Sequence, residues 1–111
     1  MFSLQLYKLN QYYFNMVQKI YYKTKDYCKV KFTANFENAE RIEILGLNSD
    51  WQNAIIMSKK KDGSFTCDIN LPKDTRHEFK YLVNEAIWLN EQEADGENQN
   101  IFGGSNSVLS V

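Results

Sequence analysis

The residues that could do chemistry are few, and they argue against catalysis. His77 is the only histidine, and the alternating residues around it place it inside a strand. A nucleophile–histidine pair needs a serine or cysteine within hydrogen-bond reach of the ring, and no local motif supplies one. An ordinary strand histidine is the favoured interpretation, and we expect a chain without enzymatic activity.

An acidic stretch late in the chain is the next candidate for chemistry. It carries four alternating carboxylates: Glu91, Glu93, Asp95 and Glu97. They could hold a cation, but they lack the Asp-x-Asn/Asp-x-Asn/Asp-Gly frame of a calcium loop. A glycosidase needs two carboxylates held across a cleft, for which one small sandwich is a poor frame. The stretch is interpreted as a solvated loop, and we expect neither a metal nor a cofactor.

Two tryptophans give a stronger signal. Trp51 follows a polar turn at residues 48–50, and Trp88 follows a turn at residues 84–85. An indole ring can stack on the apolar face of a sugar ring, and its N–H can donate to a hydroxyl. One tryptophan beside a turn is more often a lid on the core. Two of them, with Lys80 on the polar phase of the strand between, favour a shallow site for a polar ligand. Both interpretations stay open on spacing alone.

Length and composition limit the class of protein. The chain has 111 residues, enough for one domain with one modest core and too few for a (β/α)8 barrel. Its 13 basic and 14 acidic residues nearly cancel, so no bulk field points to nucleic acid or to a membrane. Cys28 and Cys67 fit no metal-ligand spacing, and residues 1–22 contain no secretory apolar region. We therefore expect a cytoplasmic protein with two reduced thiols.

The pattern after residue 27 is that of strands. Cys28, Val30 and Phe32 alternate with polar residues, as in a strand with one wet face. Further short strands are expected at 41–45, 55–57, 64–71, 76–83, 86–89 and 107–111, and residues 90–100 are expected to form a loop. About seven short strands at this spacing, separated by turn residues, predict an all-β fold, an antiparallel β-sandwich over residues 28–111.

Residues 1–27 form a distinct N-terminal extension. Apolar side chains recur at spacings of three and four, as on one helix face, at Phe2, Leu6, Leu9, Tyr13, Met16 and Ile20. Other apolar residues fall outside this face, and neither end carries a clear cap. We expect a short helix or a disordered segment over residues 1–22.

An ordered set of motifs resembles a known family. The set consists of ILGLNSDW at 44–51, KDGSF at 61–65, FKYLVN at 79–84, Trp88, and FGGSNSV at 102–108. It is similar to the isoamylase N-terminal (early set) domain, the family 48 carbohydrate-binding module. That family includes the glycogen-binding domain of the AMP-activated protein kinase beta subunit. The likeness runs from about Cys28 to Val111. It implies an immunoglobulin-like β-sandwich that binds α-1,4-glucans such as glycogen, starch or maltodextrins.

The resemblance also implies a set of carbohydrate-binding residues: Trp51, Lys80, Trp88, Phe102 and Asn106. In the family, the two tryptophans stack on glucose, the lysine bonds hydroxyls, and the last loop contributes an apolar residue and an asparagine. The sequence departs from the family at four places. Asn48 and Ser49 stand where the motif has phenylalanine and asparagine, Glu85 replaces the turn glycine, and Gly104 replaces a sugar-contacting threonine.

Two hypotheses of different class follow. The first is a non-catalytic α-glucan-binding module whose partner is a glucan or a maltooligosaccharide. The alternative is a protein-interaction module that keeps the fold and docks on a family 13-type glucan-metabolising enzyme or on itself, without binding glucan. The aromatic extension over residues 1–22 motivates this alternative, because exposed tyrosine and phenylalanine are enriched at protein interfaces.

Overall fold

The computed structural model describes residues 15–111, in which ten β-strands and one short 3-10 helix form. The elements are β1 Asn15–Tyr21, β2 Tyr27–Ala34, β3 Ile42–Leu45, η1 Leu47–Ser49, β4 Ile55–Ile56, β5 Ser58–Lys59, β6 Phe65–Pro72, β7 Arg76–Val83, β8 Ile87–Leu89, β9 Gly96–Gln99 and β10 Ser105–Ser110. No helix within this part of the chain is long and apolar enough to cross a membrane.

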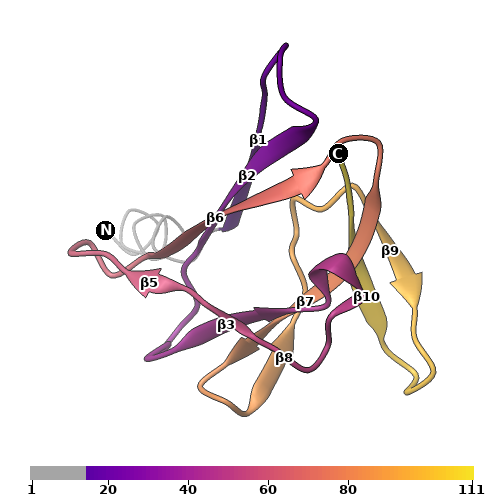
Figure 1. Ribbon diagram of the computed structural model, residues 1–111. Helices are drawn as coiled ribbons and strands as arrows, with labels where there is room; N and C mark the ends of the chain where they lie inside the picture. Colours follow the sequence, from indigo (N-terminus) through magenta and orange to yellow (C-terminus); the bar gives the residue numbers. More distant parts are fainter. Residues whose placement is uncertain (1–14) are drawn as a thin grey trace, which may run out of the picture.

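The strands form two antiparallel sheets. One has the order β1-β2-β6-β5, and the other has the order β4-β3-β7-β10-β9, with β8 paired to β7 (Figure 1). The chain passes from the larger sheet to the smaller one between β4 and β5, two strands of only two residues each. The predicted all-β, immunoglobulin-like antiparallel sandwich is confirmed. The expected count of about seven strands was too low, because β1, β5 and β9 add to it.

The core lies between the inner faces of the two sheets. Strand β7 shows why, since His77, Phe79, Tyr81 and Val83 are buried while the residues between them are not. Across the sandwich, the ring of Phe32 in β2 packs edge to face on Phe79, with centroids 5.4 Å apart. Because burial alternates strictly on β2 and β7, one face of each sheet packs in the core and the other face points away from it.

The helix predicted at the N-terminus is wrong for residues 15–21, which form strand β1. The strand pairs antiparallel with β2 and places Val17 opposite Phe32, packed against the core. The spacing of Met16 and Ile20 fits a strand as well as a helix, because residues two and four apart share one face of a strand. Pairing satisfies the backbone of β2 along its outer edge. Residues 1–14 of the predicted segment lie outside the described residues.

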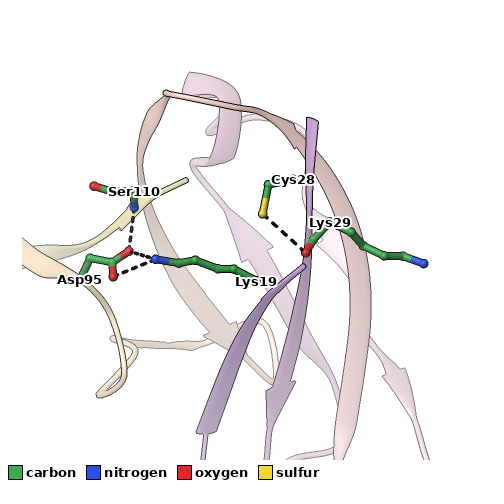
Figure 2. Close-up of polar contacts among 5 residues, drawn as sticks. All are labelled: Lys19, Cys28, Lys29, Asp95 and Ser110. Atoms are coloured by element: carbon green, nitrogen blue, oxygen red, sulfur yellow. Dashed lines mark hydrogen bonds and ion pairs between the residues drawn. The ribbon is translucent and has the colours of Figure 1, made fainter. Parts of the chain in front are cut away.

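A polar contact joins β1 to the opposite sheet. Lys19 donates two hydrogen bonds to the Asp95 carboxylate, at 2.9 and 2.7 Å, and the backbone N–H of Ser110 in β10 donates to the same carboxylate at 2.7 Å (Figure 2). Burial alone would raise the pKa of Asp95, but these hydrogen bonds and the charge of Lys19 lower it overall. Strand β1 is thus held by backbone pairing with β2 in its own sheet and by the contact of Lys19 with Asp95 beside the other sheet.

The loop predicted over residues 90–100 is wrong for Gly96–Gln99, which form the edge strand β9. This segment has a glycine and polar residues, so its own preference for a strand is low. Its pairing with β10 outweighs that preference, with Ser105 opposite Gln99 and Val108 opposite Gly96.

The two cysteines are free thiols, with Cys28 buried and Cys67 half-buried. The strand register places Cys67 opposite Phe32.

Candidate functional site

A groove of about 1050 Å³ lies on the outer face of the larger sheet. Its floor comes from the outward residues of β7, and its walls come from the turn after β3, from β8 and from the β9–β10 hairpin. All five residues predicted from the sequence line this single groove: Trp51, Lys80, Trp88, Phe102 and Asn106. Residues that are far apart in the chain are thus brought together at one site.

The first wall is built on Gly46 and the turn that follows it. Gly46 has φ 108°, a conformation that favours glycine. A Cβ atom on Gly46 would lie 2.4 Å from the backbone oxygen of Glu78 and 2.6 Å from Cζ2 of Trp51. The edge of the indole therefore packs directly on the glycine backbone. Trp51 remains 40% exposed, so it is a platform supported from below rather than a lid on the core.

Asp50 fixes the chain on either side of this tryptophan. Its Oδ1 accepts hydrogen bonds from the backbone N–H groups of Gln52, at 3.0 Å, and Asn53, at 2.9 Å. These bonds lower the pKa of Asp50, and the bond from the backbone of Asn53 has the largest effect. Before the tryptophan, Asn48 and Ser49 both adopt positive φ, at 57° and 60°.

Lys80 lies where β7 changes partners. Along one edge of β7, Arg76–Phe79 pair with β10 and Tyr81–Val83 pair with β8, so Lys80 stands at the seam between them. Its Nζ donates to the backbone oxygen of Ser105 at 2.6 Å. An ammonium group has three donors, so two are left over among residues 15–111 and can point into the groove.

Trp88 is the middle residue of β8, within the strand expected at 86–89, and it is 48% exposed. The register places it opposite Leu82, on the same outward face as Lys80. In the preceding turn, Asn84 and Glu85 both adopt positive φ. Asn84 stabilises the turn further, since its Oδ1 accepts from the backbone N–H groups of Glu40 and Arg41, at 2.7 and 3.0 Å.

The last wall is the turn at residues 100–104. Asn100 organises it: Oδ1 accepts from the backbone N–H groups of Phe102 and Gly104, at 3.0 and 3.2 Å, and Nδ2 donates to Asn106 Oδ1 at 3.1 Å. Asn106 in turn donates to Glu78 Oε1 on the groove floor at 3.1 Å. Phe102 is 89% exposed at the tip. The Asn106 amide keeps one N–H for a ligand hydroxyl.

His77 lines the groove with only 7% of its surface exposed, and it is not placed for catalysis. Its Nδ1 accepts the backbone N–H of Asn48 at 3.1 Å. The proton is therefore on Nε2, which lies 2.8 Å from Oγ1 of Thr75, whose hydroxyl donates to the backbone oxygen of Pro72 at 2.5 Å. Neither nitrogen is free to take a proton from a nucleophile. Burial lowers the pKa of His77, which keeps the ring neutral at physiological pH.

The acidic stretch is also accounted for by internal contacts. Glu91 is buried and accepts a 2.6 Å hydrogen bond from the Tyr81 hydroxyl. Burial raises the pKa of Glu91 despite that bond. Asp95 pairs with Lys19. Within residues 15–111, no group of three histidine, cysteine or carboxylate side chains is placed to hold a metal ion.

Sequence reasoning missed Glu78, Asn100 and the role of His77. A signal for Glu78 was present, because it shares the outward phase of β7 with Lys80, two residues away. Asn100 stands two and four residues before the amides that it caps, a pattern typical of asparagine in turns. His77 gave no signal, since its partner Asn48 is 29 residues away.

Comparison with protein families gives one finding. The family described as the glycogen recognition site of AMP-activated protein kinase matches residues 28–111. The match covers β2 to β10 and every groove residue named above, and it begins after β1. A search of curated proteins gives no match.

Proposed function

This chain belongs to the family of the glycogen recognition site of AMP-activated protein kinase, and from that premise we propose that it is a non-catalytic module that binds α-1,4-glucans. The observation that supports the proposal is the single groove with a half-exposed tryptophan on each of two walls. Trp51 and Trp88 stack on glucose units. The free donors of Lys80 and Asn106 bond sugar hydroxyls between them.

The polar floor suits an uncharged polyhydroxyl ligand. Lys80 and Glu78 place a cation and an anion side by side on β7, with Asn106 bonded to the carboxylate. Hydroxyl groups can donate to carboxylate oxygens and accept from ammonium or amide groups. A strongly charged ligand would meet a like charge on one side of the floor. The proposal includes a cytoplasmic location, which the two free thiols support.

Isothermal titration with maltoheptaose and β-cyclodextrin tests the proposal, with cellohexaose as the β-linked control. We expect heat and a change in tryptophan fluorescence with the α-linked ligands. Trp51→Ala and Trp88→Ala should each weaken binding by about 1–3 kcal/mol, as for a lost aromatic anchor. Tyr21→Ala, an exposed aromatic on the opposite sheet, should leave the affinity unchanged. No heat at millimolar ligand would refute glucan binding.

A protein-interaction role is the second candidate, and the exposed face of β1 supports it. Met16 and Ile20 are 40% and 43% exposed on this face, and Tyr21 beside them is 55% exposed. Strand β1 is also an edge of its sheet among the described residues, and edge strands can pair with another chain. Light scattering on the full chain and on Ile20→Lys tests self-association. A monomer in both cases would exclude this version.

A further inference from the structure

The turn that carries Trp51 is a conformation that needs support from outside. Gly46, Asn48 and Ser49 all have positive φ, a region that residues with a Cβ atom occupy only at a cost in free energy. Two hydrogen bonds act within the turn, from Gly46 N–H to the oxygen of Asp50 at 2.8 Å and from Asp50 N–H to that of Leu47 at 3.1 Å. A third comes from outside, and it ends on His77.

His77 can accept that bond only in one state. The amide of Asn48 is a donor, so Nδ1 must present a lone pair. A protonated imidazolium has hydrogens on both nitrogens and would turn a donor toward a donor. The Asn48 N–H would then lose this part-buried hydrogen bond and face a second donor, which costs free energy. The fit of the turn to β7 thus depends on the neutral form of one buried ring.

The same turn determines where the indole lies. Trp51 follows Asp50 directly, and its ring edge packs on Gly46, at the start of the turn. A displacement of residues 46–50 from β7 therefore moves both the backbone and the packing surface of the platform. The groove floor at Lys80 and the wall at Trp88 are built on other contacts and would stay.

We propose that His77 is a positioning residue, which holds the Trp51 platform through its Nδ1 lone pair and makes glucan binding weaken as the pH falls below neutrality. This inference rests on the proposed glucan-binding function. His77 lines the groove but is only 7% exposed, and the proposed role involves no direct bond to the ligand. It acts through Asn48 on the turn, and through the turn on the tryptophan.

Charged groups near the ring do not replace this bond. From the turn, Asp50 is the one ionisable residue, and its carboxylate is engaged by Gln52 and Asn53. From β10, Leu109 stands opposite His77 in the register. On β7 itself, Arg76 and Glu78 belong to the outward phase, and Asp74 lies in the turn before the strand. Burial is the cause of the lowered His77 pKa, with no compensating carboxylate.

Two substitutions separate the nitrogens of the ring. Asn at position 77 places an amide oxygen near the site of Nδ1 and keeps an acceptor for Asn48, without a titratable group. Gln places its polar atoms near the site of Nε2 and leaves the Asn48 amide without a partner. Affinity for maltoheptaose is measured for His77→Asn, His77→Gln and the unsubstituted chain. The pH range runs from about 8 down to the lowest pH at which the three proteins stay folded, because burial lowers the pKa of His77 below its ordinary value of 6.5.

The unsubstituted chain should lose about tenfold in affinity over this range, the scale of one lost hydrogen bond. His77→Asn should remain within about threefold at every pH, and His77→Gln should bind about tenfold more weakly throughout. Equal affinities and equal pH profiles for all three proteins would overturn the proposal. Should His77→Gln fail to fold, the flat profile expected for His77→Asn still decides the question.

A readout without glucan keeps this inference separate from the proposed function. In the Trp88→Phe background, Trp51 is the one tryptophan, and its emission reports on the platform alone. A one-proton change in emission on acidification, absent when His77→Asn is added, supports the positioning role even if no glucan binds. An emission that does not change with pH in the folded protein would exclude it, whatever the glucan titration gives.

Discussion

The two turns that form walls of the groove are supported in opposite ways. The turn at residues 46–50 is tied to the interior, with Leu47 buried, the Asn48 amide on His77 and the indole of Trp51 on Gly46. The turn at residues 100–104 is organised by Asn100 at the surface, and Phe102 at its tip is almost fully exposed.

This difference implies different behaviour toward a ligand. The first turn shares its contacts with the core, so its platform is pre-organised and costs little further ordering on binding. The second turn has few buried contacts, which is typical of segments that open locally, so it can adapt to the ligand. Changes in the first turn should therefore alter stability and affinity together, and changes in the second should alter affinity alone.

Gly46→Ala should have the largest effect. The added Cβ meets the Glu78 oxygen and the Trp51 ring at less than 3.0 Å, in a conformation that disfavours alanine. We expect a loss of about 2–4 kcal/mol in unfolding free energy, from backbone strain and overpacking combined, and a loss of glucan binding. Urea unfolding and maltoheptaose titration measure the two.

Gly103→Ala is the matched control in the second turn. Gly103 also has positive φ, at 87°, but a Cβ there has no neighbour within 4 Å. Only the backbone strain of about 1 kcal/mol should remain. Equal destabilisation by the two substitutions would show that the packing of Trp51 on Gly46 contributes nothing, and the contrast between the turns would fail.

Asn100→Ala tests the second turn directly. It removes the acceptor for the amides of Phe102 and Gly104 and the donor to Asn106. We expect glucan affinity to fall by about 1 kcal/mol, the net value of a hydrogen bond near the surface, with a smaller change in unfolding free energy. Asn70→Ala, on the exposed face of the opposite sheet, is the control. A larger effect on stability than on affinity would contradict the adaptable turn.

Lys19→Met separates stability from affinity on the side away from the groove. Losing the Asp95 pair should cost about 1 kcal/mol of unfolding free energy, the upper end for partly exposed ion pairs, and leave glucan binding intact. The folded-state pKa of Asp95 is lowered, so this stability is present above the ordinary aspartate pKa of 3.8 and is lost as the pH falls through the lower folded value.

Urea unfolding at neutral and at acidic pH measures the contribution of the Lys19–Asp95 ion pair to the unfolding free energy. Lys29→Met is the matched control, because the Lys29 pair with Asp68 is long, at 3.9 Å, and more exposed. It should change stability by less than about 0.5 kcal/mol. If Lys19→Met weakened glucan binding, β1 would have to support the groove through the Lys19 contact with Asp95.

Strict alternation made most of the fold predictable. On β2 and β7 each residue's phase matched its burial, and the motifs placed Trp51, Trp88 and Lys80 at one groove. Strand β1 was missed because the spacing of Met16 and Ile20 fits a helix as well as a strand. Strand β9 was missed because its pairing with β10 outweighs a low local preference. The hydrogen bonds that hold the groove residues in place were also missed, because they join distant parts of the chain.

The hydrogen bonds that aim the site join residues far apart in the chain, such as Asn48 with His77 and Asn106 with Glu78. A pattern read along the sequence registers a residue's type and its neighbours, and it carries no information on such distant partners. Residues that line the groove could therefore be named from the sequence, and the hydrogen bonds that orient them could not.

Gly104→Thr should have the smallest effect, and it is a gain. Gly104 lines the groove, its φ is not in the left-handed region, and an added Cβ would lie 3.6 Å from Asn100 Nδ2, an ordinary contact. A threonine therefore fits and presents a hydroxyl to the ligand. We expect glucan affinity to rise by about 0.5–1 kcal/mol, the net value of one hydrogen bond.

Gly104→Val is the matched control, since it has the same shape without the hydroxyl. Titration with maltoheptaose should show a gain for threonine and none for valine. An equal gain for both would mean that restricting the backbone of residues 100–104 improves binding by itself, because a β-branched residue has fewer conformations than glycine. The conformational freedom of the second turn would then reduce the affinity, because ordering this turn on binding costs free energy that the pre-organised first turn does not lose.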